Sequence, residues 1–373
     1  MNRKVVAAGH LCMDITPVFP GSDGADAASV LVPGRLTQVG PAGMSIGGAV
    51  ANTGLAMKFF GENVYLAGKT GMDFFGDAIE KKLIEAGAAD GLIRKAGETT
   101  SYTMVLAIPG TDRIFLHHPG ANDTFSSEDI SDGLLQGASL FHFGYPPLMR
   151  RFYEDDGREL VRLFRRAKAA GCVTSLDLAA VDAGSDAGKA DWQKILSGVF
   201  PYVDIFVPSA EEILFMLDRP VFEDVRRRSA GKDFCEVLDV NRDLANVSDF
   251  CMNRGVRILM IKCGAPGLYY RTGPEDTVRP VCEALGCDEK AWAGREGFEK
   301  SFVPERVLSG TGAGDAAIAA FLTGMLRSFT PEKCVRFAAA EGACCVEAYD
   351  SLSGLRSFEE VEEKLAAGWR KRG

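Results

Sequence analysis

Residues 309–315 read Ser-Gly-Thr-Gly-Ala-Gly-Asp and lead directly into an apolar run, Ala-Ala-Ile-Ala-Ala-Phe-Leu-Thr-Gly-Met-Leu, at residues 316–326. The glycines permit positive φ and carry no Cβ, so backbone N–H groups can approach a ligand closely. A helix that begins here adds unpaired N–H donors and the positive end of its dipole. The stretch therefore predicts a binding site for an anion such as phosphate.

Asp315 is the only charged residue of this loop. A carboxylate beside a phosphate site is electrostatically unfavourable, but it makes sense if Asp315 accepts the proton of a hydroxyl that attacks the phosphate. A tight connection with Asp as an ordinary N-cap is the competing interpretation. The glycine pattern also imitates a dinucleotide-binding loop, although its place near the C-terminus, outside an opening βαβ unit, is wrong for that function.

The composition of the 373 residues indicates a globular α/β protein, either one large domain or two modest ones. A net charge of −9 argues against nonspecific nucleic-acid binding but not against a nucleotide ligand. The ten cysteines show neither CxxC nor zinc-site spacing, which indicates free thiols in a reducing compartment. Because the sequence shows neither a signal peptide nor an apolar run of membrane-spanning length, we expect a cytoplasmic protein without a membrane partner.

Two further candidate sites lie near the N-terminus. Val5–Gly9 is predicted to form a buried strand, followed by a loop that delivers Asp14 to a ligand or uses it as a turn cap. Gly47 and Gly48 are predicted to open a second helix, with Asn52 one turn inside. The Asn amide can both donate to and accept from a hydroxyl. Close helix packing around a satisfied Asn is the alternative.

A small lid sheet is predicted from two segments, about 15–46 and 99–122. The first is long for a plain loop and contains short extended pieces at 29–32 and 35–39. The second contains a hairpin pattern around Pro109–Asp112.

The rest of the chain alternates between strand and helix patterns, with strands at 139–144, 173–178, 204–209 and 257–264. This alternation favours one α/β domain over residues 1–373, doubly wound around a mainly parallel sheet with helices on both faces. The charge-rich segment 221–242 is predicted to be a solvated insertion, and a polar stretch at 282–305 precedes the glycine loop.

In this order, the features resemble the ribokinase-like (PfkB) carbohydrate kinase family over essentially the full chain. Gly9 and Asp14 look like the opening of that family, and Gly47-Gly48 with Asn52 is similar to its first signature. Gly312-Ala313-Gly314-Asp315 is similar to its second signature, which carries a catalytic Asp.

The resemblance implies transfer of the γ-phosphoryl group of ATP, with Mg²⁺, to a hydroxyl of a sugar or sugar-like alcohol. Asp315 would be the general base, and backbone donors around Gly312, Ala313 and Gly314 would form the anion hole. The remaining implied site residues are Asp14, Gly48 and Asn52 for substrate hydroxyls, Lys262, Gly264, Gly267 and Thr311 for the nucleotide, and Glu212 for Mg²⁺ through water. Relatives also often form homodimers through their lid strands.

Three departures from the family pattern are visible. The loop opens Ser309-Gly310 instead of Asp-Thr, which leaves open the monovalent-cation site of many relatives. Ser209 replaces the Asn of an Asn-x-x-Glu element that ends at Glu212, so a weaker or water-mediated metal contact is expected. Lys262 stands where many relatives have a small hydroxyl residue, and it could reach the nucleotide phosphates or extend to solvent.

Two alternatives remain open from the sequence. The first is a nucleoside kinase of the same fold, in which Tyr102 or Phe115 would stack on a base, although aromatic residues at alternating strand positions usually serve packing. The second is a non-catalytic ligand-binding relative, against which the retained Asp315 argues.

Overall fold

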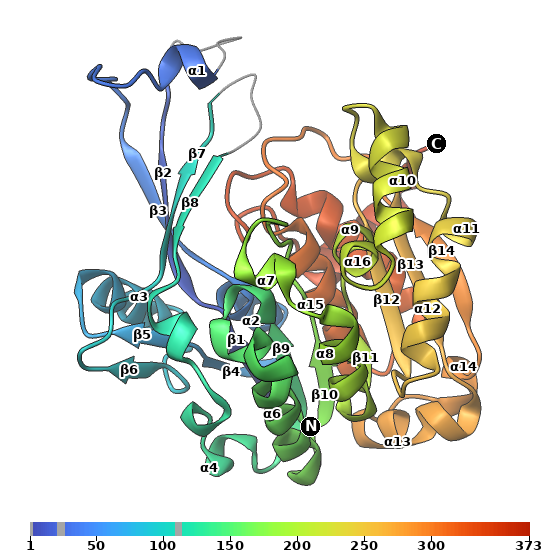
Figure 1. Ribbon diagram of the computed structural model, residues 1–373. Helices are drawn as coiled ribbons and strands as arrows, with labels where there is room; N and C mark the ends of the chain where they lie inside the picture. Colours follow the sequence, from blue (N-terminus) through green and yellow to red (C-terminus); the bar gives the residue numbers. More distant parts are fainter. Residues whose placement is uncertain (1–2, 21–26, 109–113) are drawn as a thin grey trace.

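A computed structural model describes residues 3–20, 27–108 and 114–373 of the chain. Its main body contains an eight-stranded sheet with helices packed on both sides (Figure 1). The strands, in spatial order, are β14 (Glu296–Lys300), β13 (Gly267–Thr272), β12 (Ile258–Cys263), β11 (Ile205–Phe206), β10 (Val173–Leu176), β9 (Ala138–Gly144), β1 (Lys4–Gly9) and β4 (Asn63–Ala67).

The six strands from β12 to β4 pair in parallel, whereas β13 and β14 add an antiparallel edge. The prediction of a mainly parallel, doubly wound sheet is therefore confirmed. In such a sheet, the carboxyl ends of the parallel strands meet along one edge, where ligands gather.

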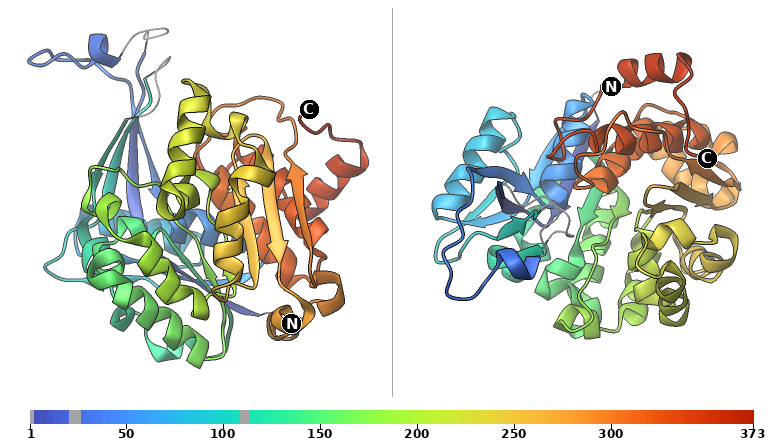
Figure 2. Two further views of the ribbon diagram at one scale, coloured as in Figure 1. Left: turned by 45° about the vertical axis from the view of Figure 1, so that its right-hand side comes forward. Right: turned by 90° about the horizontal axis from the view of Figure 1, so that it is seen from above.

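Two hydrophobic cores lie on the two faces of this sheet. In β1, Val5 and Ala7 point into one core, and Val6 and Ala8 into the other, as the alternation of strand side chains requires. The first core is covered by α2 (Ala49–Phe59), α3 (Phe74–Glu85), α13 (Glu275–Leu285), α14 (Glu289–Trp292), α15 (Ala313–Leu326), α16 (Pro331–Cys345) and α17 (Phe358–Ala366). The second is covered by α6 (Arg158–Ala169), α8 (Trp192–Val199), α9 (Ala210–Leu217), α10 (Arg219–Ser229) and α12 (Ala245–Met252). The two views in Figure 2 show these layers.

A second, four-stranded sheet projects from the main body (Figures 1 and 2). Its strands, in spatial order, are β3 (Ala42–Gly47), β2 (Cys12–Pro17), β7 (Tyr102–Leu106) and β8 (Ile114–His118). The predicted small sheet is thus present, and β7 and β8 pair as the predicted hairpin. The predicted turn at 109–112 lies outside the described residues. A further pair, β5 (Lys69–Gly71) and β6 (Ile93–Lys95), lies beside α3.

Several local predictions were wrong. Asp14 lies inside strand β2 and not in a loop, because β2 begins only three residues after β1 ends. Gly9, with φ of +127°, and the two residues after it make this abrupt change of direction. Ala27–Val30 forms a short helix, α1, where extended backbone was predicted, and residues 35–39 form no strand.

Segment 221–242, which was predicted to be a solvated insertion, and the polar stretch 282–305 both contain regular secondary structure. Residues 221–242 contain most of α10, and Arg228 at its end pairs with the buried carboxylate of Asp243 at 2.6 Å. Residues 282–305 contribute Trp292, which is fully buried, to the first core and strand β14 to the sheet edge. Both segments are therefore integral parts of the fold.

Candidate active site

The first turn of α15 lies at the carboxyl-end edge of the large sheet and begins the candidate site. Gly312 is its N-cap, with φ of +78°. A Cβ at this position would lie 2.3 Å from the Cβ of Ser351, so both the backbone conformation and the close packing require glycine. The turn presents Ala313, Gly314 and Asp315, and helix termini of this kind have backbone N–H groups without intrahelical partners.

Asp315 is surrounded by three neutral hydrogen-bond donors. Its Oδ2 accepts from Asn52 Nδ2 at 3.0 Å, and its Oδ1 accepts from Thr53 Oγ1 at 3.2 Å. The phenol of Tyr145 bridges both oxygens, at 2.9 and 2.8 Å. Burial raises the pKa of Asp315, whereas the charge of Lys262 and these donors lower it. Among the described residues, the carboxylate is thus held in place without a direct basic partner.

Helix α2 supplies two of these donors. It begins after Gly48, with φ of +90°, where a Cβ would lie 2.6 Å from Nδ1 of His10. Asn52, one turn inside, donates to Asp315 and accepts at Oδ1 from the Ser351 hydroxyl at 2.8 Å. The predicted helix start is present, with Asn52 one turn inside it, and protein groups bond both ends of the Asn52 amide.

Tyr145 was missed in the sequence. It follows directly after β9, at the carboxyl end of a parallel strand, with φ of +66°. Positive φ is uncommon for a residue other than glycine, and such conformations cluster at functional sites. Its position immediately after the predicted strand 139–144 is the sequence signal that could have identified it.

Lys262, the last residue but one of β12, forms a buried ion pair with Asp177. The Nζ–Oδ1 distance is 2.6 Å, and the two side chains are 12% and 0% exposed, so the solvent-directed alternative for Lys262 is wrong. Burial raises the pKa of Asp177 to about 8, although Lys262 lowers it. The Lys262 chain runs beside α15, because a Cβ on Gly314 would lie 3.3 Å from its Cδ and 3.9 Å from its Nζ. The ammonium therefore lies next to the predicted anion site.

Glu212 belongs to the same electrostatic cluster. Its carboxylate accepts from the backbone N–H of Ser209 at 2.7 Å in a capping box that starts α9. Its negative charge raises the pKa of Lys262, as do those of Asp177 and Asp315. Within residues 3–20, 27–108 and 114–373, no three His, Cys, Asp or Glu side chains are grouped closely enough to hold a metal. Mg²⁺ usually keeps several waters and binds one or two carboxylates together with phosphate oxygens, and a single carboxylate such as that of Glu212 is chemically compatible with this ion.

Two of the predicted nucleotide residues, Thr311 and Gly264, lie at turns, and Gly267 is the first residue of β13. Thr311 Oγ1 accepts a hydrogen bond from the Ser309 hydroxyl, and the Thr311 backbone N–H donates to the same hydroxyl. These two hydrogen bonds stabilise the glycine loop. Gly264 has φ of +56° and lies against Cys235, and Gly267 packs against the backbone of Glu299. The two glycines thus permit the tight β12–β13 turn.

The small sheet presents a polar row toward the main body. Ser45, Asp14, Thr103 and His117 are in register across its four strands, so their side chains share a face. Thr103 bonds Nδ1 of His117 at 3.0 Å, and the imidazole lies 5.3 Å from that of His10, just beyond β1. A Cβ on Gly47 would lie 2.1 Å from Oδ2 of Asp14, so this row abuts the start of α2.

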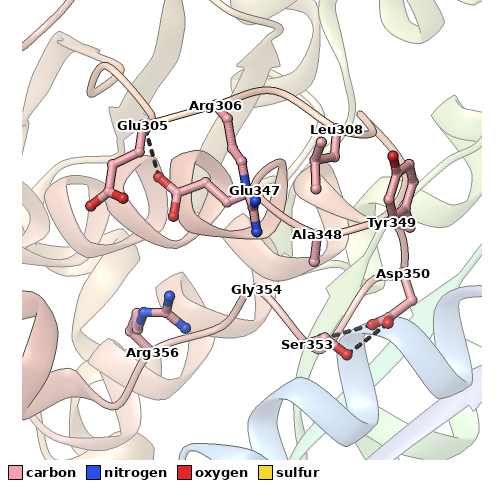
Figure 3. Close-up of a pocket in the computed structure, with 10 residues that line it drawn as sticks. All are labelled: Glu305, Arg306, Leu308, Glu347, Ala348, Tyr349, Asp350, Ser353, Gly354 and Arg356. Carbon is pink, nitrogen blue, oxygen red and sulfur yellow. Dashed lines mark hydrogen bonds between the residues drawn. The ribbon is translucent and has the colours of Figure 1, made fainter.

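A pocket of about 880 Å³ opens beside the glycine loop (Figure 3). It is lined by Glu305, Arg306 and Leu308 on the approach to the loop, and by seven residues within 347–356 after α16. Glu347 accepts from the backbone N–H of Glu305 at 2.8 Å, and Asp350 accepts from the Ser353 hydroxyl at 2.7 Å. Leu308 N–H donates to Val346 O at 2.8 Å, which ties the two segments together.

Comparisons with known proteins find relatives of this chain. The family model described as "pfkB family carbohydrate kinase" matches residues 2–356. An uncharacterized sugar kinase of Archaeoglobus fulgidus is 24% identical over 298 residues, which are 79% of this chain and 95% of that protein. Fructokinase-1 of Zea mays is 26% identical over 226 residues, 60% of this chain and 65% of that protein.

Solved structures share the fold. A putative ribokinase II from E. coli, in complex with ATP and Mg²⁺, superposes with a TM-score of 0.71 at 20% identity, over 98% of this chain and 99% of that one. No helix in the described part of the chain is long and apolar enough to cross a membrane.

Proposed function

Because the chain belongs to the PfkB family of carbohydrate kinases, we propose that it transfers the γ-phosphoryl group of ATP to a sugar hydroxyl, with Asp315 as general base. The observation that carries this proposal is the contact between two helix N-termini. The first turn of α15 and the first turns of α2 meet at Asp315, whose carboxylate accepts hydrogen bonds from the side chains of Asn52 and Thr53. A base fixed by neutral donors beside an anion site suits an alcohol that attacks a phosphoryl group.

The acceptor positions of Asp315 suggest how the alcohol binds. A carboxylate can accept about four hydrogen bonds. Asn52 and Thr53 occupy one position on each oxygen, and Tyr145 shares the other two. The substrate hydroxyl would take one of these shared positions and leave Tyr145 on the other. Since Asp315 is only 4% exposed, this exchange requires movement of Tyr145 or of the small sheet.

The nucleotide phosphates would lie against the N–H groups at Gly312, Ala313 and Gly314. Phosphoryl transfer has a loose transition state, so these fixed donors would act by stabilising charge on the transferring group. Lys262 would exchange Asp177 for a phosphate oxygen, since its ammonium already lies beside Gly314. Mg²⁺ would be held by Glu212 through water and would neutralise phosphate charge.

The remaining nucleotide contacts are assigned by position. The pocket lined by 305–308 and 347–356 would receive the base and ribose, because it adjoins the glycine loop and its volume is typical of small-ligand sites. Thr311 would border this end of the site, and the β12–β13 turn with Gly264 and Gly267 would border the phosphates. The Ser309 and Thr311 hydroxyls bond each other. The sequence leaves monovalent-cation dependence open, and replacing K⁺ in the assay tests it.

The small sheet would serve as the lid over the sugar, with Asp14 and the start of α2 at Gly48 holding its hydroxyls. A closed, dry site favours the charge stabilisation described above.

We also propose that the lid forms a homodimer. On its other face, Met44, Ile15, Met104 and Leu116 are in register, and three of them are 37–53% exposed. Light scattering coupled to size-exclusion chromatography tests this.

A coupled assay of ADP release with Mg²⁺ and ATP, over a panel of free sugars and adenosine, tests the proposed function. We expect sugar-dependent ADP release that the Asp315→Asn variant lacks. A preference for adenosine would instead favour the nucleoside kinase. Ring stacking by Tyr102 has little support, because Tyr102 packs against Phe75 and His118. Absence of turnover with every compound, despite ligand binding, would favour a non-catalytic relative.

A further inference from the structure

His10 is a buried imidazole at the junction of the small sheet with the main body. It lies between β1 and β2 and is 2% exposed. Its ring centroid is 5.3 Å from that of His117, in the polar row of the small sheet, and 6.1 Å from that of Tyr145, whose phenol bonds Asp315. A Cβ on Gly48, at the start of α2, would lie 2.6 Å from Nδ1 of His10. The imidazole therefore borders the small sheet, the start of α2 and the residue that contacts the proposed base.

The backbone of His10 is bonded at both groups, but its ring is not. The backbone N–H donates to Gly144 O and the carbonyl accepts from Val50 N–H, both at 3.2 Å. Neither ring nitrogen has a hydrogen-bond partner among the described residues. His10 lies at the base of the small sheet, where β2 begins and β8 ends, whereas the two gaps in the described lid follow the far end of β2 and separate the far ends of β7 and β8. Since buried polar groups in native proteins are nearly always bonded, the ring nitrogens call for a partner from outside the protein.

The ring of His10 is neutral, and one tautomer is favoured. Burial, together with the charge of His117, lowers the pKa of His10 to about 3, so the imidazole has one N–H and one lone pair. Nδ1 faces the start of α2, where the positive end of the helix dipole favours a lone pair over an N–H. The hydrogen is therefore assigned to Nε2, which can donate to an oxygen of a ligand.

The neighbours of His10 lie at the two ends of the proposed sugar site. On one side, Tyr145 bonds Asp315, which would receive the reacting hydroxyl. On the other side, His117 is in register with Thr103 and Asp14, the residues at the end where further hydroxyls would be held. A sugar that spans these two ends has an oxygen at the level of the imidazole.

We infer that His10 binds the sugar, and that its Nε2–H donates to an oxygen between the reacting hydroxyl and the hydroxyls held by Asp14. This inference rests on the proposed kinase function and deepens it, because it adds a residue that determines affinity for the sugar. A neutral donor remote from the transferring group contacts the sugar equally before and during the reaction. Its loss should therefore raise the KM for sugar and leave kcat nearly unchanged. Because His10 and Asp315 are 2% and 4% exposed, the sugar would enter when the small sheet moves from the main body.

Two substitutions of His10 test this in the coupled assay, with whichever of ribose, fructose and glucose is the best substrate. His10→Leu removes the donor at similar volume and should raise the KM for sugar about tenfold or more, with kcat and the KM for MgATP close to wild type. His10→Gln, whose amide nitrogen can take the place of Nε2, should restore most of the affinity for sugar. A wild-type KM for sugar in His10→Leu, or equal losses in both variants, overturns the inference and leaves the kinase function intact.

His118→Leu is the matched control, because His118 pairs with Tyr102 on the face of the small sheet opposite to His117. Its KM for sugar should equal that of the wild type. An increase as large as that of His10→Leu would show that the loss does not come from the imidazole of His10, and would overturn the inference.

Thermal unfolding without ligand separates a binding role from a structural one. His10→Leu removes a buried polar group that has no partner among the described residues, so we expect it to unfold at a temperature no lower than that of the wild type. A raised KM for sugar together with a lower unfolding temperature would assign His10 a structural role and overturn the inference.

If no sugar is turned over, the proposed function fails, and calorimetry with ribose, fructose and glucose, in the presence of a non-hydrolysable ATP analogue, then decides the inference. Sugar binding that His10→Leu weakens at least tenfold supports it. Sugar binding of equal strength in the variant and the wild type, or binding of none of the three sugars, overturns it.

Discussion

The Tyr145→Phe substitution tests how the protein controls its base. The phenol donates to both oxygens of Asp315, at 2.9 and 2.8 Å, and this contact is among those that lower the pKa of the buried carboxyl. A hydrogen bond to a charged group contributes about 1.5–3 kcal/mol. Because about 1.4 kcal/mol corresponds to a factor of ten, loss of the phenol should disfavour the charged base by about tenfold or more.

The expected sign follows from the protonation of Asp315. Removing a donor to the charged form raises the pKa of the carboxyl, so a larger fraction is protonated and inactive on the acid side. We therefore expect the kcat/KM of Tyr145→Phe to fall about tenfold or more below that of wild type toward the acid end of the profile, and the difference to shrink as the pH rises. Initial-rate measurements between pH 5.5 and 8.5 provide the comparison.

Tyr270→Phe is the matched control, because this tyrosine is 8% exposed in β13 and makes no contact with Asp315 that the described structure records. Its profile should coincide with that of the wild type. If the Tyr145→Phe profile also coincides with wild type, or if activity falls equally at every pH, the phenol does not stabilise the charged base.

Three further substitutions test separate parts of the account. Lys262→Met should raise the KM for MgATP about tenfold or more, with the KM for sugar nearly unchanged, because it removes an ammonium beside the anion site. If the variant and the wild type have the same KM for MgATP, Lys262 does not bind the nucleotide phosphates. Glu341 is 0% exposed in α16, and burial raises its pKa to about 8. A carboxyl whose folded pKa exceeds its unfolded pKa loses stabilisation as pH rises between the two values. Glu341→Gln should therefore increase the free energy of unfolding at pH 8 by about 1–3 kcal/mol. Between pH 5 and pH 8, the free energy of unfolding of the variant should decrease less than that of the wild type. Urea titrations at both pH values measure this, and a decrease as large as that of the wild type would count against the prediction. Gly312→Ala should lower the free energy of unfolding by about 1–3 kcal/mol, since the new Cβ meets Ser351 at 2.3 Å with positive φ; wild-type stability would show that the loop readily adapts.

Features set by local backbone chemistry could be predicted from the sequence. Gly48 and Gly312 both adopt positive φ at helix N-caps, as the glycine-rich stretches suggested. The alternation of strand and helix patterns likewise predicted the mainly parallel sheet, because parallel neighbouring strands need a long crossover connection, which is usually a helix. Asp14 was misplaced because nothing in the residues between Gly9 and Cys12 signals that a second strand begins at once.

The missed site residues depend on contacts between distant segments. Tyr145 and Asp315 are 170 residues apart, and Ser351 lies 299 residues from Asn52. Tyr145 and Asp177 do lie at or beyond the ends of predicted strands, so the rule that ligands gather at carboxyl ends could have identified both. No local pattern marks Ser351, whose role arises only when the turn after α16 packs against Gly312.

Turnover of Asp315→Asn, measured beside its affinity for ATP, tests the central claim most directly. The amide keeps the shape of the side chain but cannot accept the proton of an attacking alcohol. We predict that kcat falls by about 10²–10⁴ while calorimetric ATP affinity stays within a few-fold of wild type. A variant that phosphorylates sugar at a near-normal rate would contradict the assignment of Asp315 as the base.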